Sequence, residues 1–371
     1  MGIFLNESDI PSAELLHFYV VFENTALGIT VIMVPFTILV MVFTSNSVIN
    51  AYRLLLINEL SWSLVLDITA ALIGAVSLFP LPCYYGVSVT SALSHTQQLI
   101  NFVVGIGVLI MKDFSIFYQL EYILVKSLAM DSKIRTLFQI VPKSGVVLIH
   151  LGIIVSVLGA VLGPIIYYLP NQGEQKRLFI SLDPFVGKLY EDHPDIICFI
   201  DGENTAKALI VGFIALSATP FIGLVFLIIM YNSMHQSNGS THTYRLQKML
   251  FRSLVFQLIA FTFLLCLPVM MLMSALLFQL RDGPTITVIC FCFVLMHTPI
   301  DCFMILYFIK PYRIVVAHLL KVLQTAAGDA VWLKTGVHVL KGPLGDETEM
   351  DIGWVEWGTV ADVADDGRRC M

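Results

Sequence analysis

Seven stretches of the chain are apolar enough and long enough to cross a lipid bilayer. A hydrocarbon core of about 30 Å requires an α-helix of about 20 residues. The stretches run from Thr25 to Phe43, Leu60 to Phe79, Leu99 to Phe117, Val146 to Tyr168, Ala208 to Tyr231, Leu254 to Phe278 and Ile286 to Phe308. Barrel strands are shorter, about 10 residues, and alternate in polarity. We therefore expect an all-α membrane protein, a seven-transmembrane helix bundle.

Composition supports a membrane protein and argues against several other classes. With 57% hydrophobic and 13% charged residues, the chain does not provide the solvated surface of a soluble globule. It has no zinc-protease motif, phosphate-binding glycine loop or nucleophile elbow. We therefore expect no enzymatic activity, no cofactor, no metal site and no nucleic-acid partner.

The basic residues between the stretches predict the orientation of the bundle. Cytoplasmic loops are enriched in Lys and Arg. With the N-terminus outside, the inner loops hold Arg53, Lys126, Lys133, Arg135, Lys143, Arg245, Lys248 and Arg252. The outer loops then hold Lys176, Arg177, Lys188, Lys207 and Arg281. This excess predicts an extracellular N-terminus over residues 1–24 and a transmembrane domain over residues 25–309.

Two features are expected on the outer side. Asn6 begins a glycosylation sequon in the N-terminal segment, so we expect a sugar there if the segment is exposed. Cys83 follows the second span and Cys198 lies in the loop before the fifth, both on the oxidising side. A disulfide between them would hold that loop over the mouth of the bundle, and two free thiols are the alternative.

Charged residues inside the spans are candidates for a functional core, because they are costly in a membrane. Asp67 lies in the second span and Asp301 in the seventh. They form either a cation- or proton-sensitive switch or a hydrogen-bonded packing pair. Lys112 and Asp113 are adjacent, so we expect them to point to different faces and to reach headgroups or separate partners near the inner end of the third span.

The histidines and prolines in the spans can be interpreted without a specific function. His150 and His297 are single histidines with no second ligand at metal-binding spacing, and we interpret both as core residues. Pro220, Pro268 and Pro299 fall inside the last three spans and predict kinks there. Kinks suit a bundle that changes shape, although proline is also common in ordinary membrane helices.

Basic residues mark the predicted inner face. Arg245, Lys248 and Arg252 are spaced at i, i+3 and i+7, so they share one face at the start of the sixth span. This face either docks an intracellular partner or rests on anionic headgroups. After the seventh span, residues 310–324 predict a short amphipathic helix on the lipid bilayer, with Arg313 near its start. Residues 325–371 are acidic and glycine-rich and predict a disordered cytoplasmic tail.

Several of these segments together resemble nematode serpentine chemoreceptors of the Str superfamily, with the Srh and Sri branches most similar. The segments are Tyr244-Arg245-Leu246-Gln247-Lys248-Met249 at the start of the sixth span, Gln257 within it, Asp67, and Lys310-Pro311-Tyr312-Arg313. The similarity covers about residues 15 to 323. It implies a G-protein-coupled chemosensory receptor in the plasma membrane of sensory neuron cilia, with a small odorant or pheromone-like ligand and a heterotrimeric G protein as partners.

For such a receptor we expect ligand to enter among the outer halves of the helices, where bundle pockets form. Gln97 and Asn101 offer polar groups there, and Met273, Phe278 and Phe291 offer soft or aromatic surfaces. Plain packing is the alternative for each. Arg245, Lys248, Arg252 and Arg313 form the expected G-protein face.

One departure and the rival functions leave the coupling open. The family tends to carry an arginine after the third span, but this chain has Phe117-Tyr118-Gln119-Leu120-Glu121-Tyr122. A retinal protein needs a lysine in the last span, which has none. An odorant-gated ion channel with an inner N-terminus, or a transporter-like seven-helix protein without G-protein coupling, is the remaining alternative. Nothing in the sequence specifies an oligomeric state.

Overall fold

The computed structural model describes residues 10–44, 50–78, 83–87, 95–127, 142–167, 171–182, 184–193, 196–198, 202–236, 241–278, 280 and 282–335. Asn6, Arg281 and residues 336–371 lie outside these ranges, so the predictions made for them stay predictions. The chain divides into two compact units, Met1–Leu320 and Lys321–Met371. In the second unit, the described part consists of the end of one helix.

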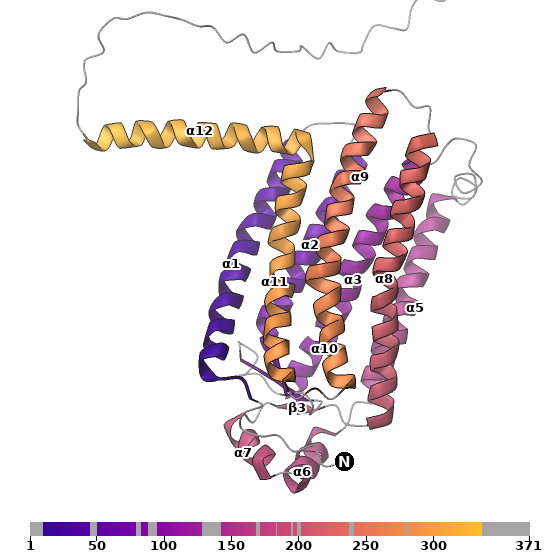
Figure 1. The fold of residues 1–371 in the computed structure, drawn as a ribbon, viewed down its shortest axis with the longest axis vertical. Coiled ribbons are helices and arrows are strands. Elements are labelled where there is room, and N and C mark those ends of the chain that lie inside the picture. The colour runs from indigo at the N-terminus through magenta and orange to yellow at the C-terminus, as the bar shows by residue number, and fades with distance from the viewer. Residues whose placement is uncertain are drawn as a thin grey trace, which may run out of the picture. The chain divides into compact units, whose positions relative to one another are not determined.

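Seven helical segments of the described chain are long and apolar enough to cross a membrane. They are Ala13–Phe43, Tyr52–Ile73, Thr96–Ser127, Ser144–Tyr167, Ile210–His235, Gln247–Ala275 and Gly283–Phe308. These segments belong to the helices α1 (Ala13–Phe43), α2 (Asn50–Ile73), α3 (His95–Ser127), α5 (Lys143–Tyr167), α8 (Gly202–Gln236), α9 (Thr241–Phe261) continuing into α10 (Leu267–Leu277), and α11 (Gly283–Phe308). They lie side by side as a bundle (Figure 1).

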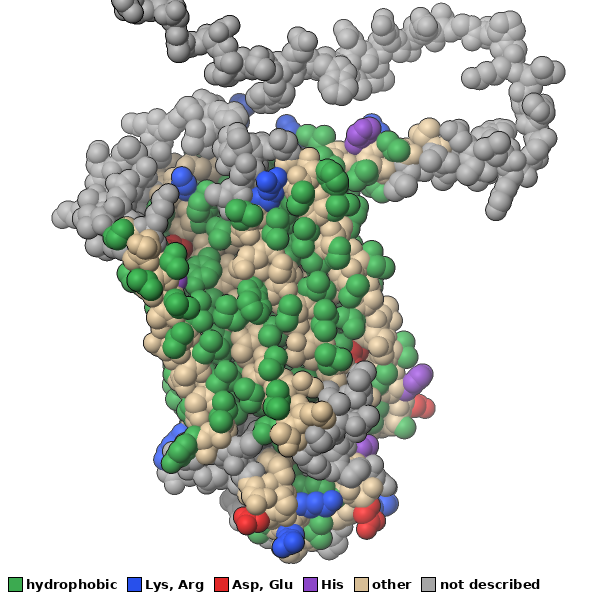
Figure 2. All heavy atoms as spheres, turned by 180° about the vertical axis from the view of Figure 1, so that it is seen from behind, with side chains coloured by type: hydrophobic (Ala, Val, Ile, Leu, Met, Phe, Trp, Pro, Cys, Tyr) green, Lys and Arg blue, Asp and Glu red, His purple; other side chains and the backbone are tan. Residues whose placement is uncertain are grey.

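The sides of the bundle are apolar. Many large hydrophobic side chains there are more than half exposed, such as Leu148, Phe221 and Ile32. Figure 2 shows hydrophobic side chains along the length of the bundle and Lys and Arg near its two ends. Because such a surface is unfavourable in water and favourable in lipid, it is the surface expected of a membrane-spanning bundle.

A small antiparallel sheet closes one end of the bundle. It consists of β1 (Ala75–Ser77), β2 (Cys83–Gly86) and β3 (Ile197–Cys198) in that order, with Val76 paired to Tyr85 and Cys83 paired to Cys198. The helices α6 (Gln172–Leu182) and α7 (Pro184–Asp192) lie at the same end (Figure 1). We call this end of the bundle the sheet end.

The second span begins and ends earlier than hydropathy predicts. We expected it to continue to Phe79, but α2 ends at Ile73 and the chain enters β1 at Ala75. Gly74 has φ of 50°, in the left-handed region that favours glycine. The prediction was wrong because the residues of β1 are as apolar as those of the helix before it.

The first helix and the helix after the seventh span extend well beyond their predicted ranges. The first begins at Ala13 rather than near Thr25, with the Ser12 hydroxyl accepting a hydrogen bond from the Leu15 backbone N–H at 3.2 Å. The helix after the seventh span, α12, covers Lys310–Thr335. Its first turn is anchored by Tyr312, which is buried in the same hydrophobic cluster as Tyr52 and Ile309.

The sixth span contains an irregular turn beside its proline. Residues Thr262–Cys266 form a π-helical segment, η3, between α9 and α10. Pro268 is the second residue after it and lacks the backbone N–H that a regular helix would use there. The other two predicted kink positions, Pro220 and Pro299, lie inside α8 and α11.

Candidate functional site

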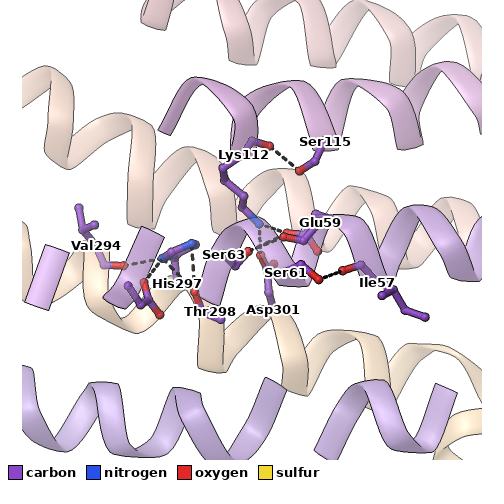
Figure 3. Close-up of polar contacts among 11 residues, drawn as sticks. Ile57, Glu59, Ser61, Ser63, Lys112, Ser115, Val294, His297, Thr298 and Asp301 are labelled. Atoms are coloured by element: carbon purple, nitrogen blue, oxygen red, sulfur yellow. Dashed lines mark hydrogen bonds and ion pairs between the residues drawn. The ribbon is translucent and has the colours of Figure 1, made fainter. Parts of the chain in front are cut away.

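A buried ion pair network lies in the middle of the bundle. Lys112 of α3 is fully buried, and its ammonium group is ion-paired with the carboxylates of Glu59 in α2 and Asp301 in α11. The distance from Lys112 Nζ to Asp301 Oδ2 is 3.2 Å. Figure 3 shows the three side chains converging from three helices. One cation therefore links α2, α3 and α11 away from water.

This position for Lys112 corrects the sequence interpretation, which expected it to reach headgroups or a separate partner near the end of a span. The third span continues to Ser127 rather than ending near Phe117, so Lys112 lies in the middle of α3. A lysine buried at this depth needs acidic partners, and Glu59 and Asp301 supply them from neighbouring helices. Asp113, next in sequence, is only partly buried.

Asp67 lies in a second set of polar contacts beside the first. The Thr30 hydroxyl of α1 donates to Asp67 Oδ2 at 3.0 Å. His297 Nδ1 lies 3.6 Å from Asp67 Oδ1 and 2.6 Å from the carbonyl oxygen of Val294. His297 and Asp301 are four residues apart on α11, so the two sets of contacts share a helix face. Together they connect α1, α2, α3 and α11.

Sequence reasoning missed Glu59. The residue lies one position before the predicted start of the second span and was therefore left out of the membrane. In the structure, Glu59, Ser63 and Asp67 are each at most 1% exposed. They are spaced at i, i+4 and i+8, so they line one face of α2. This spacing of polar residues within an apolar helix is the signal in the sequence that could have found the network.

His150 belongs to a separate pair between α3 and α5. Its Nε2 lies 2.8 Å from Glu121 Oε2, and its ring meets the Tyr118 ring edge-on at 4.8 Å. The two paired side chains are 27% and 23% exposed, so this pair lies nearer the surface of the bundle than the Lys112 network. Glu121 stands in the segment where the family tends to carry an arginine.

The sheet end is held by a disulfide between Cys83 and Cys198. The Gln172 amide group brackets the backbone of Cys198, accepting from its N–H and donating to its carbonyl, both at 3.0 Å. The Tyr190 hydroxyl lies 3.1 Å from the sulfur of Cys198. Burial raises the pKa of Tyr190 to about 12. These contacts fix α6 and α7 to the sheet.

The residues predicted for ligand binding lie on α3, α10 and α11 and in the turn after α10. Gln97 is exposed and Asn101 is partly buried, one turn further along α3. Met273 lies against α8, where a Cβ on Gly212 would be 3.4 Å from its methyl carbon. The Phe291 ring lies 6.5 Å from the Tyr19 ring of α1, and Phe278 is 74% exposed. The contacts of Met273 and Phe291 are thus with different helices.

The predicted G-protein face is exposed. Arg245, Lys248 and Arg252 all present exposed side chains on α9. The Lys248 ammonium group lies 5.8 Å from the centre of the Tyr244 ring. Arg313 is exposed on α12, with its guanidinium 5.8 Å from the centre of the Tyr307 ring.

Side-chain and backbone contacts hold the helix ends together at the end of the bundle away from the sheet. The Gln247 amide of α9 donates to the carbonyl of Lys126 at 3.2 Å, and the Ser233 hydroxyl of α8 donates to the carbonyl of Ser127 at 2.6 Å. Arg53 donates to the carbonyl of Met41 at 3.2 Å, at the end of α1. The carboxyl end of α3 is therefore tied directly to α8 and α9.

The chain is similar to a known family of membrane proteins. Residues 15–322 match the family model described as serpentine type 7TM GPCR chemoreceptor Srh. A search of curated proteins found no match. The matched region begins two residues inside the first span and includes the other six spans and the first part of α12.

Proposed function

Because the chain belongs to the serpentine type 7TM GPCR chemoreceptor Srh family, a family of receptors rather than enzymes, we propose that it detects a small external molecule and activates a heterotrimeric G protein. Its seven spans make it a multi-pass membrane protein. We place it in the plasma membrane of sensory neuron cilia, with the sheet end outside. The ligand is an odorant or pheromone-like small molecule.

The observation that carries the proposed mechanism is the Lys112 network. An ion pair buried in a bundle has few acceptable geometries, because each charge needs its partner to offset its desolvation. A bundle joined through such a pair favours discrete arrangements over gradual deformation. We propose that ligand binds one arrangement better than another and thereby shifts the population of receptors.

The α9 face provides the expected output. Its three cations are exposed, and the α9 backbone is interrupted at η3 beside Pro268. Interruptions of this kind are frequent at functional sites and permit one part of a helix to move relative to the other. The inner end of α9 would then move when the Gln247 contact with α3 breaks.

The test is a signalling assay in cells that express the full chain at the surface. G-protein activation is recorded against an odorant panel for the wild type and for the triple variant Arg245→Ala, Lys248→Ala, Arg252→Ala. The matched control is Arg177→Ala, Lys188→Ala, which removes exposed cations from the sheet end. The proposal expects loss of signalling in the triple variant alone. Normal signalling in the triple variant at normal surface level would overturn the docking face.

The orientation has its own test, and it separates the receptor from the channel. An epitope tag on the N-terminus should be stained on intact cells, and a tag on the C-terminus only after permeabilisation. The orientation is supported by the loop charges and by the disulfide at the sheet end, since disulfides persist in oxidising environments. The opposite staining pattern would favour an odorant-gated channel.

A further inference from the structure

Glu23 is a buried acid that the Lys112 network does not explain. It lies on α1 between Tyr19 and Ala26, and all three face inward. Glu23 is only 1% exposed. Tyr19 and Ala26 belong to a hydrophobic cluster at the sheet end that also contains Tyr85, Val288 and the disulfide, with Phe291 and Cys292 packed against it. We call this group the sheet-end cluster.

Neither carboxylate oxygen of Glu23 has a hydrogen-bond partner by the distance and angle of a normal bond, within the part of the chain that is described. The Tyr19 phenol, one helical turn earlier on α1, is close enough to act on the carboxylate as a hydrogen-bond donor in a less favourable geometry, and the Cys292 thiol is close enough to interact with it electrostatically. The ion pairs seen in these ranges join Lys112, His150 and His297 to other acids. No Lys, Arg or His among the described residues is paired with Glu23.

This lack of a cation contrasts with the middle of the bundle. There the fold supplies Lys112 to two buried acids, as charge burial requires. At Glu23 the described residues bury an acid and supply no counter-charge. Buried polar groups in native structures are usually satisfied, and those that are not call for an explanation such as an ion or a ligand.

The surroundings of Glu23 suit an organic cation. The Tyr19 ring, one helical turn before Glu23 on α1, has its centre 6.5 Å from the ring centre of Phe291 on α11. Tyr85 of β2 belongs to the same cluster and stacks on His193 at 4.2 Å. Aromatic faces attract ammonium groups through cation–π interactions, and a carboxylate forms strong charge-assisted hydrogen bonds with them. A metal ion would instead require several oxygen ligands, and the described chain has no group of three metal-ligating residues here.

We propose that Glu23 is the anionic anchor of a binding site for a small protonated amine, formed by α1, α11 and the sheet at the outer end of the receptor. This inference deepens the proposed function and rests on it, because the sheet end must face outside for an external amine to reach the site. The ammonium group pairs with the Glu23 carboxylate, and its carbon chain lies against Tyr19 and Phe291. No bond is made or broken.

The experiment measures direct binding to the full chain, purified in detergent. The probes are hexylamine and phenethylamine, each with its matched alcohol, hexanol and phenethyl alcohol. Affinity is measured as the probe concentration that is needed to raise the thermal midpoint of the receptor. The variants are Glu23→Gln, which keeps the shape and removes the charge, and Glu23→Asp, which keeps the charge. The control is Glu14→Gln, an exposed acid on the same helix.

The proposal expects the wild type and the Glu14→Gln control to bind each amine more tightly than its alcohol. Glu23→Gln should lose roughly 10- to 100-fold in amine affinity, the effect of removing a charged hydrogen-bond partner, with alcohol binding unchanged. Glu23→Asp should retain a preference for amines. If Glu23→Gln does not fold, the amine preference of the wild type and of Glu23→Asp decides the question.

The proposal would be overturned if the wild type bound an amine and its matched alcohol equally tightly. It would also be overturned if Glu23→Gln bound the amines as tightly as the wild type does, or if neither amine bound at concentrations up to the solubility limit of the alcohols. These failures are distinguishable from failure of the proposed function. If the receptor activates a G protein in response to neutral odorants in cells but does not bind amines, the proposed function stands and the amine site at Glu23 is wrong.

Discussion

Lys112 and Asp301 are separated by 189 positions in sequence, yet their side chains meet at 3.2 Å in the middle of the bundle. Glu59 completes the contact from a third helix. The fold thus gives one buried cation to two buried acids. A ligand that changes how α3, α2 and α11 pack must also change the distances within this network, and we therefore propose it as the centre of the switch between receptor states.

Removing the cation should destabilise the receptor strongly. Lys112→Met keeps the length of the side chain but leaves Glu59 and Asp301 buried without a counter-charge. Breaking one partner of a buried ion pair costs about 3–5 kcal/mol. We expect a large fall in the thermal midpoint of the purified protein, whereas Lys248→Met, at an exposed lysine of α9, should change it little.

A double variant shows whether the loss arises from the pair itself. In Lys112→Met, Asp301→Asn the second substitution removes an acid that has lost its partner, so the combined effect should be smaller than the sum of the single effects. Strictly additive effects would show that Lys112 and Asp301 do not interact in the folded protein.

The bundle could be predicted from sequence, but which charges pair within this network could not. Seven long apolar segments require seven spans whatever their partners are. Hydropathy also places the start of two predicted spans just beyond a charged residue, at Thr25 after Glu23 and at Leu60 after Glu59. Both acids are buried in the structure. Which helices lie side by side depends on packing between distant segments, and a single sequence does not contain that information directly.

The sheet end shows a second limit. The residues before and after Gly74 are equally apolar, so the end of α2 depends on one backbone conformation rather than on composition. The two cysteines could be identified as candidates because both follow spans on the same predicted side. Their pairing brings β2 and β3 into register, which no property of either segment alone predicts.

Loss of the disulfide should loosen the sheet end. It joins residues 115 positions apart, and loops of about 100 residues gain about 4.7 kcal/mol from such a link in the chain-entropy account, with measured losses of about 2–5 kcal/mol. Cys83→Ser, Cys198→Ser should therefore lower the thermal midpoint and the surface level. Cys292→Ser, at a partly buried free cysteine, is the control. Equal stability of the two variants would mean that the link contributes nothing.

Close packing between α8 and α9 predicts a cost for adding a single methyl group. A Cβ on Gly223 would lie 2.9 Å from both methyl carbons of Leu258, so Leu258 must shift. Overpacking of this kind costs about 1–3 kcal/mol, which should exceed the gain in helix propensity. Gly159→Ala in α5, where a Cβ meets nothing within 4 Å, should be neutral or stabilising. A stabilising Gly223→Ala would contradict this packing. Thermal midpoints of both variants provide the measurement.

The pH dependence of stability should carry a contribution from Tyr190. Burial raises the pKa of this phenol to about 12 in the folded protein, whereas an unfolded chain releases the proton near pH ~10. Between these values the folded state holds a proton that the unfolded state has lost, so the free energy of unfolding falls as pH rises. The stability is complete below about pH 10 and decreases above it, by up to about 1.4 kcal/mol per pH unit.

The variant Tyr190→Phe separates this effect from the hydrogen bond to Cys198. Losing the bond should lower the free energy of unfolding by about 1 kcal/mol, by the same amount at every pH. Losing the ionisable group should make the decline between pH 9 and pH 11 less steep than in the wild type. Tyr312→Phe should act in the same direction, because burial also raises the pKa of Tyr312 to about 12 despite the opposing effect of Arg53. An unchanged pH profile in Tyr190→Phe would show that this phenol is not buried in the folded receptor.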